Sequence, residues 1–265
     1  MPSNISSAPE LQGQVAFIVG GSSGIGFASA ITLAQRGCSV AIFAHQGVAQ
    51  AVAQAKSQGI ELLGITGDAS DSAQVQAGIQ QTLASLGGLH ITIHTAAIHP
   101  YGNAGDTSED TWDRVMAVNL KSVFLTAHHA LPHMLAQGHG VIVNTASIQG
   151  TACQRDVCAY ATSKAAILGF TRSLAVDYSS LGIRAVSISP GAIRTPMLDL
   201  SVDKFGGNRP KEEVFADWGQ GVPMGRIGEA QEVAEVIAFA VSARASYCSG
   251  TEFVVDGATS KKLCI

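Results

Sequence analysis

The chain has 265 residues, a formal net charge of −4 at pH 7, and 14% charged residues. That length suits one large α/β domain, because such folds often exceed about 200 residues undivided. An acidic balance without a long lysine or arginine run argues against nucleic-acid binding. No apolar stretch reaches the roughly 18 residues of a membrane span, and residues 1–14 lack a signal peptide's apolar core, so we expect a soluble cytoplasmic protein without membrane attachment.

Apolar runs alternate with helical patterns along the chain, as in a doubly wound sheet. Runs such as VAFIVG are apolar throughout, which is typical of parallel strands buried on both faces. The sequence predicts a Rossmann-like α/β fold with a mostly parallel seven-stranded sheet and helices on both faces. Strands are expected at 14–19, 39–44, 60–66, 89–95, 140–146, 183–189 and 252–255. Residues 1–10 are expected to be a flexible segment, 11–258 one domain, and 259–265 a C-terminal tail.

A glycine-rich turn follows the first predicted strand. Gly20, Gly24 and Gly26 have the spacing G-x-x-x-G-x-G at the point where the strand turns into a helix. Glycines there let a pyrophosphate approach the backbone, and the helix N-terminus supplies free N–H groups. An ordinary glycine-rich βα turn fits less well, because strand, turn and helix open the first βαβ unit. We predict that a dinucleotide binds here, with contacts also from Ser22, Ser23 and Ile25.

A tyrosine and a lysine four residues apart form the second motif. Tyr160 and Lys164 lie in a predicted helix, so they share one face, and a nearby positive charge lowers the pKa of a phenol. Ser147 ends an apolar strand-like run thirteen residues upstream and could hold a substrate oxygen. Taken alone, the pair is more often a surface tyrosine beside a solvated lysine. With the serine, it suits proton transfer to or from an alcohol or ketone.

These motifs together resemble those of the short-chain dehydrogenase/reductase family. The resemblance covers about residues 11 to 258, with the motifs in the family's order and at its usual separations. It is carried by Gly20 to Gly26, Asp68, Asn119 in MAVNLKSVF, Ser147 in VIVNTASIQG, Tyr160, Lys164 and SPGAIRTPM. It implies an NAD(P)-dependent oxidoreductase that interconverts a secondary alcohol and a ketone by direct hydride transfer, so no metal is required.

The resemblance also implies a role for each residue of the catalytic set. Tyr160 is the implied general acid and base, and Lys164 stabilises its phenolate and binds the nicotinamide ribose. Ser147 positions and polarises the substrate oxygen. Asn119 is implied to hold a water in a proton relay; a helix-kink or capping residue is the open alternative.

Other residues are implied to contact the cofactor. Asp68 resembles the family's adenine-contacting aspartate; its alternative role is to cap the helix that starts near Asp71. Further cofactor contacts are expected from His45, Ala69, Thr95, Ala96, Pro190, Gly191, Ile193 and Thr195, as well as from Tyr160 and Lys164. The second strand ends at Ala44, where an acidic residue would select NAD and a basic one would accommodate the NADP phosphate. We favour NAD slightly, because no arginine or lysine follows Ala44 to hold that phosphate.

Two positions depart from the family pattern beside the cofactor. Val19 replaces the threonine usual before the first glycine, which removes a side-chain hydrogen bond from that turn. His94-Thr95-Ala96-Ala97 replaces the familiar NNAG. His94 either replaces a lost hydrogen bond, which we favour, or adds a titrating group near the active edge.

Residues 197–225 interrupt the alternation between the sixth strand and the last long helix. The segment begins at the active edge, so a substrate lid is favoured over a surface insertion. Substrate contacts are expected from Gln149, Cys153, Met197 and Trp218. The wall is mainly apolar, which suits a modest-sized ketone or secondary alcohol, although some of these residues could be core.

Two other functions remain open. A carrier-linked 3-oxoacyl reductase using NADPH would favour a basic patch near the entrance, where only Arg155, Lys204, Arg209 and Lys211 are scattered. A non-catalytic dinucleotide-binding regulator would be expected to lack serine, tyrosine or lysine from the catalytic set, and all three are present. Enoyl reductases of the wider family space their tyrosine and lysine further apart.

Metal binding and assembly leave weaker signals. His129 and His133 stand four apart on a predicted helix, but no third ligand accompanies them, so no metal site is predicted.

The helical patterns at 110–136 and 157–181 carry more apolar residues than one sheet-facing stripe needs, including Phe124, Leu131, Ile167, Phe170 and Leu174. In the resembled family these helices pack between subunits, which implies a homotetramer.

Overall fold

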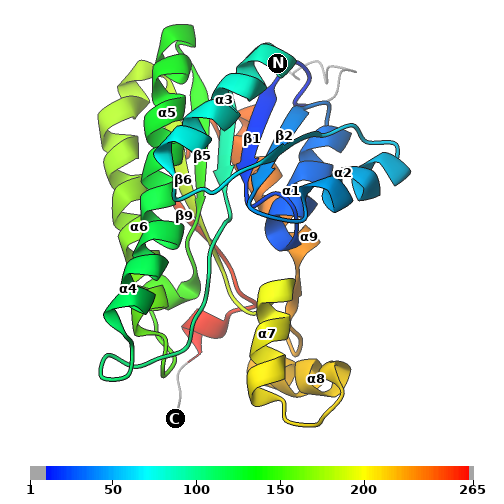
Figure 1. Ribbon diagram of the computed structural model, residues 1–265, viewed down its shortest axis with the longest axis vertical. Coiled ribbons are helices and arrows are strands. Elements are labelled where there is room, and N and C mark those ends of the chain that lie inside the picture. Colours follow the sequence, from blue (N-terminus) through cyan, green and yellow to red (C-terminus); the bar gives the residue numbers. More distant parts are fainter. Residues whose placement is uncertain (1–9, 263–265) are drawn as a thin grey trace, which may run out of the picture.

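The computed structural model describes residues 10–262, and its centre is a seven-stranded sheet in the order β3-β2-β1-β4-β5-β6-β9. Every pairing within this sheet is parallel, which confirms the predicted doubly wound α/β fold (Figure 1). The strands are β1 (Val15–Val19), β2 (Ser39–Ala44), β3 (Leu63–Thr66), β4 (Ile91–His94), β5 (Gly140–Thr145), β6 (Ile183–Pro190) and β9 (Glu252–Val255). The predicted segment 1–10 and the end of the predicted tail lie largely outside the described residues.

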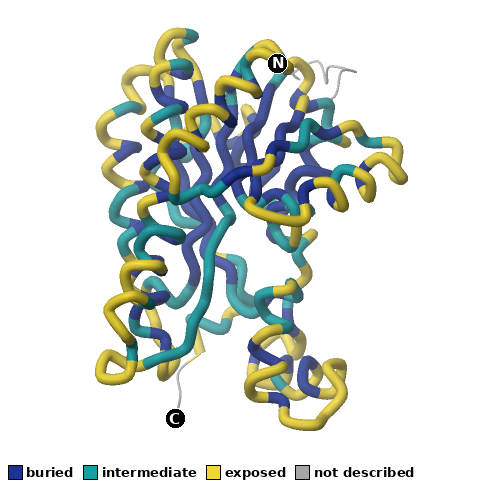
Figure 2. The backbone as a smooth tube through the Cα atoms, viewed as in Figure 1, coloured by how far each residue is buried: buried dark blue, intermediate teal, exposed yellow. Residues whose placement is uncertain are grey.

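Helices cover both faces of the sheet. The main ones are α1 (Gly24–Gln35), α2 (Val48–Ser57), α3 (Ser72–Leu86), α4 (Glu109–Val115), α5 (Ser122–Gln137), α6 (Cys158–Tyr178) and α9 (Ala230–Val241). Neighbouring residues of β1 point to opposite faces: Ile18 packs with α1, α2 and α9, whereas Phe17 packs with α3 and α5. Because both faces of β1 are buried, this strand is apolar at every position, and the central strands form the dark buried centre of Figure 2.

The two long helical patterns differ in detail from their predicted form. The pattern at 110–136 is divided into α4, a π-helical turn at Met116–Lys121, and α5. Three of the apolar residues expected between subunits are instead buried in the core of this chain: Leu131 of α5, and Ile167 and Leu174 of α6. Phe124 remains 47% exposed, and Val176 of α6 is 82% exposed.

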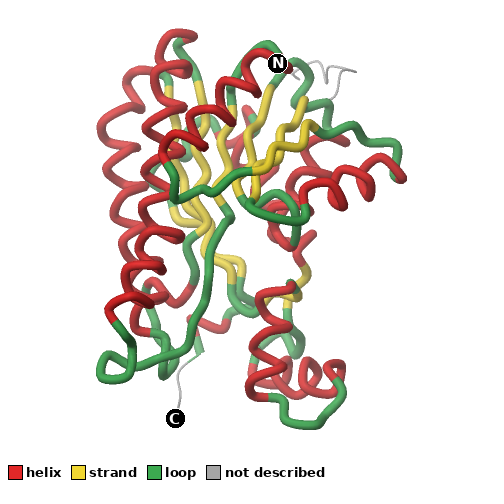
Figure 3. Tube along the Cα trace, viewed as in Figure 1, coloured by secondary structure: helices red, strands yellow, loops and turns green. Residues whose placement is uncertain are grey.

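Residues 197–225 form two helices rather than an irregular loop. Helices α7 (Pro196–Phe205) and α8 (Lys211–Gly221) extend from one end of the molecule (Figure 3). They enclose an apolar cluster of their own, made by Val202, Val214, Phe215 and Ile227. At their base, β7 (Ile193–Arg194) pairs in parallel with β8 (Gly228–Glu229). These two-residue strands were not predicted, because they are too short to show a periodic pattern.

The turn between β1 and α1 packs tightly against the chain that follows β4. A Cβ added at Gly26 would lie 2.3 Å from the Gly20 backbone oxygen and 2.5 Å from Thr95 Oγ1. Neither group can move without displacing the turn or the adjacent strand. The absence of a side chain at Gly26 therefore lets the turn after β1 pack directly against the chain that follows β4.

We predict that Gly26→Ala lowers the free energy of unfolding by about 2 to 3 kcal/mol, because the added methyl group overpacks this contact. The thermal unfolding midpoint measures the loss. Gly221→Ala at the end of α8 is the matched control, since its Cβ would meet nothing within 4 Å. Equal midpoints for Gly26→Ala and the native chain would contradict the prediction.

Candidate active site

The predicted site residues gather at one edge of the sheet. Gly20, Thr95 and Gly191 directly follow β1, β4 and β6, and Ser147 lies two residues beyond β5. These strands are neighbours and parallel, so their carboxyl ends share an edge. Ligands of open α/β sheets bind outside this edge.

The glycine turn has the geometry that a dinucleotide phosphate requires. Gly20 has φ +80° and Gly24 has φ +53°, a left-handed backbone that favours glycine. The Ser23 hydroxyl makes no capping hydrogen bond to α1, so the first N–H groups of the helix have no side-chain cap. A Cβ at Gly24 would lie 3.2 Å from Thr195 Cγ2, which places the loop after β6 against this turn. The residues present therefore fit a pyrophosphate at the helix N-terminus.

The altered motif after β4 is tied to the turn from the opposite side. Thr95 Oγ1 and the Thr95 backbone N–H donate hydrogen bonds of 2.9 and 2.8 Å to the Val19 carbonyl oxygen. Val19 lacks the family's hydroxyl, and the hydrogen bonds from Thr95 hold the turn at this point. Ala96 is also close, since a Cβ at Gly20 would lie 2.6 Å from the Ala96 nitrogen.

His94 does not titrate near neutral pH, and its Nε2 atom makes no hydrogen bond. The ring is buried, and its Nε2 has no hydrogen-bond partner, so this nitrogen does not replace a lost hydrogen bond. Burial, assisted by the charge of Lys164, lowers the pKa of His94 to about 3. The imidazole is therefore neutral at physiological pH and does not titrate there.

The three catalytic candidates meet where α6 passes the end of β5. Tyr160, Ser147 and Lys164 are each less than a tenth exposed. Lys164 Nζ donates a 2.8 Å hydrogen bond to the carbonyl oxygen of Thr145, the last residue of β5. The same nitrogen lies 5.5 Å from the centre of the Tyr160 ring. The lysine thus fixes the tyrosine helix to the strand that leads into Ser147.

Burial dominates the protonation of this group. It raises the pKa of Tyr160 to about 12, although the contact with the Ser147 hydroxyl acts in the opposite direction. It lowers the pKa of Lys164 to about 7. The sequence led us to expect a tyrosine pKa lowered by the lysine charge, and the opposite direction is found because both groups are desolvated. At neutral pH the phenol keeps its proton.

Asn119 connects the tyrosine helix with the loop after β4. It lies in the π-helical turn, a feature frequent at functional sites. Its side chain donates to the Ile98 carbonyl oxygen (2.9 Å) and to Ser163 Oγ (3.1 Å), and accepts from the Ile98 N–H (2.8 Å). Ser163 Oγ in turn donates to the Tyr160 carbonyl oxygen. Asn119 therefore links the loop after β4 to α6, in addition to the proton-relay role that the family resemblance implies.

Our sequence reasoning missed a residue in the β4–α4 loop, residues 95–108. The His99 ring lies against the Tyr160 ring, with their centres 4.1 Å apart. On the same loop, the Tyr101 hydroxyl donates a 2.7 Å hydrogen bond to Ser201 Oγ of α7. The available signal was the run of ring residues His99-Pro100-Tyr101 directly after the altered motif.

The adenosine side of the predicted site is formed by the ends of β2 and β3. The Asp68 carboxylate accepts bonds from the Ser70 N–H and hydroxyl, and the Ser70 N–H is the main reason why its pKa is lowered. Asp71 caps α3 with its own carboxylate, so the capping role considered for Asp68 is wrong. His45 is exposed after β2. Ser22 lies near Gly47, two residues after His45, since a Cβ at Gly47 would lie 3.6 Å from Ser22 Oγ.

The remaining cofactor candidates line the same edge. Ile25 lies in the first turn of α1, and Ala69 follows Asp68 before α3. Pro190 ends β6, and Gly191 packs beside Asp256, which a Cβ at Gly191 would approach to 2.8 Å. Ile193 is buried in β7, and Thr195 precedes α7.

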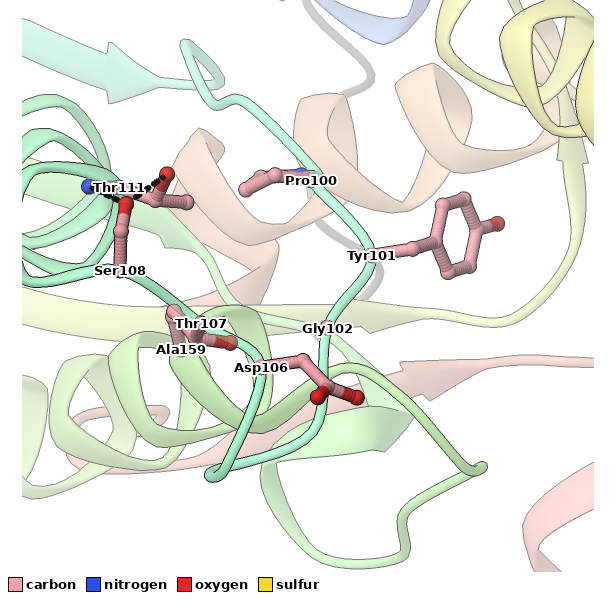
Figure 4. Close-up of a pocket in the computed structure, with 8 residues that line it drawn as sticks. All are labelled: Pro100, Tyr101, Gly102, Asp106, Thr107, Ser108, Thr111 and Ala159. Carbon is pink, nitrogen blue, oxygen red and sulfur yellow. Dashed lines mark hydrogen bonds between the residues drawn. The ribbon is translucent and has the colours of Figure 1, made fainter.

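The four substrate candidates fall in different environments. The Gln149 N–H donates to Ser147 Oγ at 3.1 Å, Cys153 is exposed, and Met197 lies in the first turn of α7. Trp218 packs against the apolar cluster between α7 and α8, which favours its core alternative. None of the predicted site residues lines the separate pocket of about 100 Å³ in Figure 4. There the Tyr101 ring is turned away from the other side chains drawn.

The described residues, 10–262, lack two features that would point to other functions. No group of three or more His, Cys, Asp or Glu side chains within that range is placed to hold a metal ion. No helix in the same range combines the length and the apolar character that crossing a bilayer requires.

A Rossmann-like sheet with a glycine turn and a Ser-Tyr-Lys group at its edge defines a nicotinamide-dinucleotide-dependent oxidoreductase. Known proteins agree. The family model described as enoyl-(acyl carrier protein) reductase matches residues 19–259. An uncharacterized oxidoreductase of Thermotoga maritima is 39% identical, over 94% of this chain and 98% of its own. The cyclohexanol dehydrogenase of Acinetobacter sp. strain SE19 is 34% identical, over 94% and 96%.

Solved structures give the same result. The crystal structure of levodione reductase superposes with a TM-score of 0.90 and 33% identity, over 96% of this chain and all of that chain. The chain belongs to the short-chain dehydrogenase/reductase family, and it is an oxidoreductase that acts on CH–OH groups. Its cofactor is a nicotinamide dinucleotide, as is typical of the family.

The buried state of His94 predicts an acid-sensitive stability. The unfolded ring binds a proton near pH 6.5, whereas the folded ring does so only near pH 3. Stability from this group is complete above pH 6.5 and falls by up to about 1.4 kcal/mol per pH unit as the pH drops towards 3. His94→Asn should therefore lose less stability than the native chain between pH 7.5 and 5.0.

Denaturant unfolding at the two pH values measures this difference, about 2 kcal/mol. The acidic limb of turnover should stay where it is, because His94 is neutral throughout that range. Equal losses of stability in the two proteins would contradict the assignment.

Proposed function

We propose that this protein interconverts a modest-sized secondary alcohol and its ketone, with Tyr160 as general acid and base. The observation that carries the proposal is the buried group of Tyr160, Ser147 and Lys164 at the carboxyl edge of the sheet. The relatives named for cyclohexanol and levodione support this substrate class.

The chain's own residues account for the proton and for the position of the reacting oxygen. A bound nicotinamide ring supplies or accepts the hydride at the carbinol carbon. In reduction, the Ser147 hydroxyl holds the carbonyl oxygen while the Tyr160 phenol donates its proton to it. The high pKa of Tyr160 keeps that proton available at neutral pH. In oxidation, the same phenol oxygen takes the hydroxyl proton.

Lys164 supports the phenolate that reduction leaves behind. Its pKa of about 7 means that the ammonium and amine forms are both populated near neutral pH. An ammonium beside the phenolate lowers the free energy of the charged form, and an amine can accept the proton during oxidation. We also assign it the hydrogen bond to the nicotinamide ribose.

The lid, residues 197–225, is proposed to cover a small substrate rather than a carrier-linked chain. Its basic side chains are engaged: Lys211 pairs with Asp203, and Arg209 pairs with Asp217. Lys204 lies over the Tyr101 ring, 4.7 Å from its centre. A phosphorylated carrier arm would find few unpaired cations on this segment, which disfavours a 3-oxoacyl reductase.

NAD is the proposed cofactor, ahead of NADP. Ala44 ends β2, and His45 and Gln46 follow it. These residues offer neither the carboxylate that binds a ribose 2′-hydroxyl nor an arginine or lysine for a 2′-phosphate. The absence of an arginine or lysine disfavours NADP more than the absence of a carboxylate disfavours NAD, because a phosphate held without charge-assisted hydrogen bonds is weakly bound.

We further propose a cytoplasmic homotetramer. The exposed Phe124 and Val176 lie on α5 and α6, the two helices expected between subunits. Phe124 and Phe170 approach edge to face, with centres 6.3 Å apart, and form an apolar surface that a second subunit would cover.

Removing the phenol hydroxyl tests the chemistry. Tyr160→Phe should lower kcat for cyclohexanone reduction at least 100-fold, the usual size of a general-acid contribution. Cofactor fluorescence titration checks that the variant still binds NADH. Tyr178→Phe, at the end of the same helix, is the matched control. A Tyr160→Phe variant with native kcat would sink the proposed mechanism.

Cofactor choice is tested by titrating the protein with NADH and NADPH and following nicotinamide fluorescence. NADH should give the lower Kd. His45→Arg should tighten NADPH binding by roughly tenfold or more, since it adds a charge-assisted hydrogen bond. His133→Arg on α5 controls for added charge. Tighter NADPH binding by the native chain would reverse our assignment.

A further inference from the structure

His99 is a ring held in place beside the proposed catalytic tyrosine. Its imidazole lies 4.1 Å from the Tyr160 ring centre and 4.6 Å from that of Tyr101. The preceding residue, Ile98, is fixed through both its N–H and its carbonyl oxygen by Asn119. The ring therefore has little freedom to turn away from the site.

The Nε2 atom of His99 is buried and has no hydrogen-bond partner. Burial lowers the pKa of this ring to about 4, so the imidazole is neutral at physiological pH. A neutral ring nitrogen can donate or accept one hydrogen bond. Buried polar atoms in proteins nearly always have a partner, so an unpaired one at an active site indicates a group that a ligand satisfies.

A second atom of this kind belongs to the turn that carries the serine. Gln149 Oε1 is also buried without a partner. Gln149 lies in the 3-10 turn Ile148–Gly150, and its own N–H donates to Ser147 Oγ. Its side-chain oxygen only accepts hydrogen bonds, so it requires a donor.

These two atoms differ from the unpaired hydroxyls of the described residues, and from His94 Nε2, which belongs to a residue inside β4. The hydroxyls of Thr92, Thr145 and Ser189 lie in strands, and a hydroxyl can rotate towards a neighbour. The ring of His99 and the amide of Gln149 instead stand on the two segments that position Tyr160 and Ser147. The His99 ring lies against the Tyr160 ring, and the Gln149 N–H donates to Ser147 Oγ, so both residues lie beside the proposed catalytic group.

We propose that the substrate carries a second oxygen on the carbon next to the reacting one, and that His99 and Gln149 hydrogen-bond it. A hydroxyl can donate to Gln149 Oε1 and accept from the His99 ring nitrogen, so we take this second group to be a hydroxyl. The substrates are then vicinal diols and the corresponding α-hydroxy ketones. This inference rests on the proposed alcohol–ketone function and narrows it to one chemical class.

Two matched pairs of ketones test the inference: 2-hydroxycyclohexanone against cyclohexanone, and 3-hydroxy-2-butanone against 2-butanone. With saturating NADH, the native chain should show a kcat/KM at least tenfold higher for the hydroxy ketone of each pair. His99→Phe keeps the ring contact and removes the nitrogen, and Gln149→Leu removes the acceptor. Each should lower this preference about fivefold, the effect of one hydrogen bond of roughly 1 kcal/mol.

His133→Phe, on α5 and beside Gln80, is the control for a histidine-to-phenylalanine change and should keep the native preference. Equal kcat/KM for both members of each pair in the native chain would overturn this inference and leave the proposed function standing. No turnover of any of the four ketones by a chain that binds NADH would overturn both. Should His99→Phe fail to fold, Gln149→Leu and the native preference still decide the matter.

Discussion

The hydrogen bond from the buried Lys164 ammonium to the Thr145 carbonyl oxygen is the contact on which the site depends. It joins α6, which carries Tyr160, to the end of β5, which leads into Ser147. An amine removed from water needs such a partner, and a backbone carbonyl at a strand end cannot move away. The hydrogen bond that burial of Lys164 requires therefore also fixes the Tyr160 phenol and the Ser147 hydroxyl relative to each other.

A second set of contacts joins loops that the chain order keeps apart. Asn119 binds the backbone of Ile98 and reaches Ser163 of α6, while Thr95 binds the Val19 carbonyl oxygen at the end of β1. The loops on the carboxyl edge are therefore connected to one another as well as to their own strands. Such cross-links make the edge one preorganised surface for cofactor and substrate.

Most of the fold could be predicted from the sequence, because continuous apolar runs and glycine turns are local signals of buried parallel strands. The catalytic group was visible too, since four-residue spacing on a helix places side chains on one face. Other features depend on contacts between distant segments. The pKa directions of Tyr160 and Lys164 follow from burial, which spacing does not show. The position of His99 against Tyr160 and the assignment of Asp71 rather than Asp68 as the helix cap also required three-dimensional structure.

The paired strands β7 and β8 join the two ends of the proposed lid segment to each other at its base. The chain leaves the body at Ile193 and returns at Gly228, and these two residues are register partners. Helices α7 and α8 pack on a core of their own, so the segment resembles a small appended module. Its length and composition can change in evolution without altering the strands that hold the cofactor. Substrate range and hydride chemistry in this architecture can therefore diverge independently.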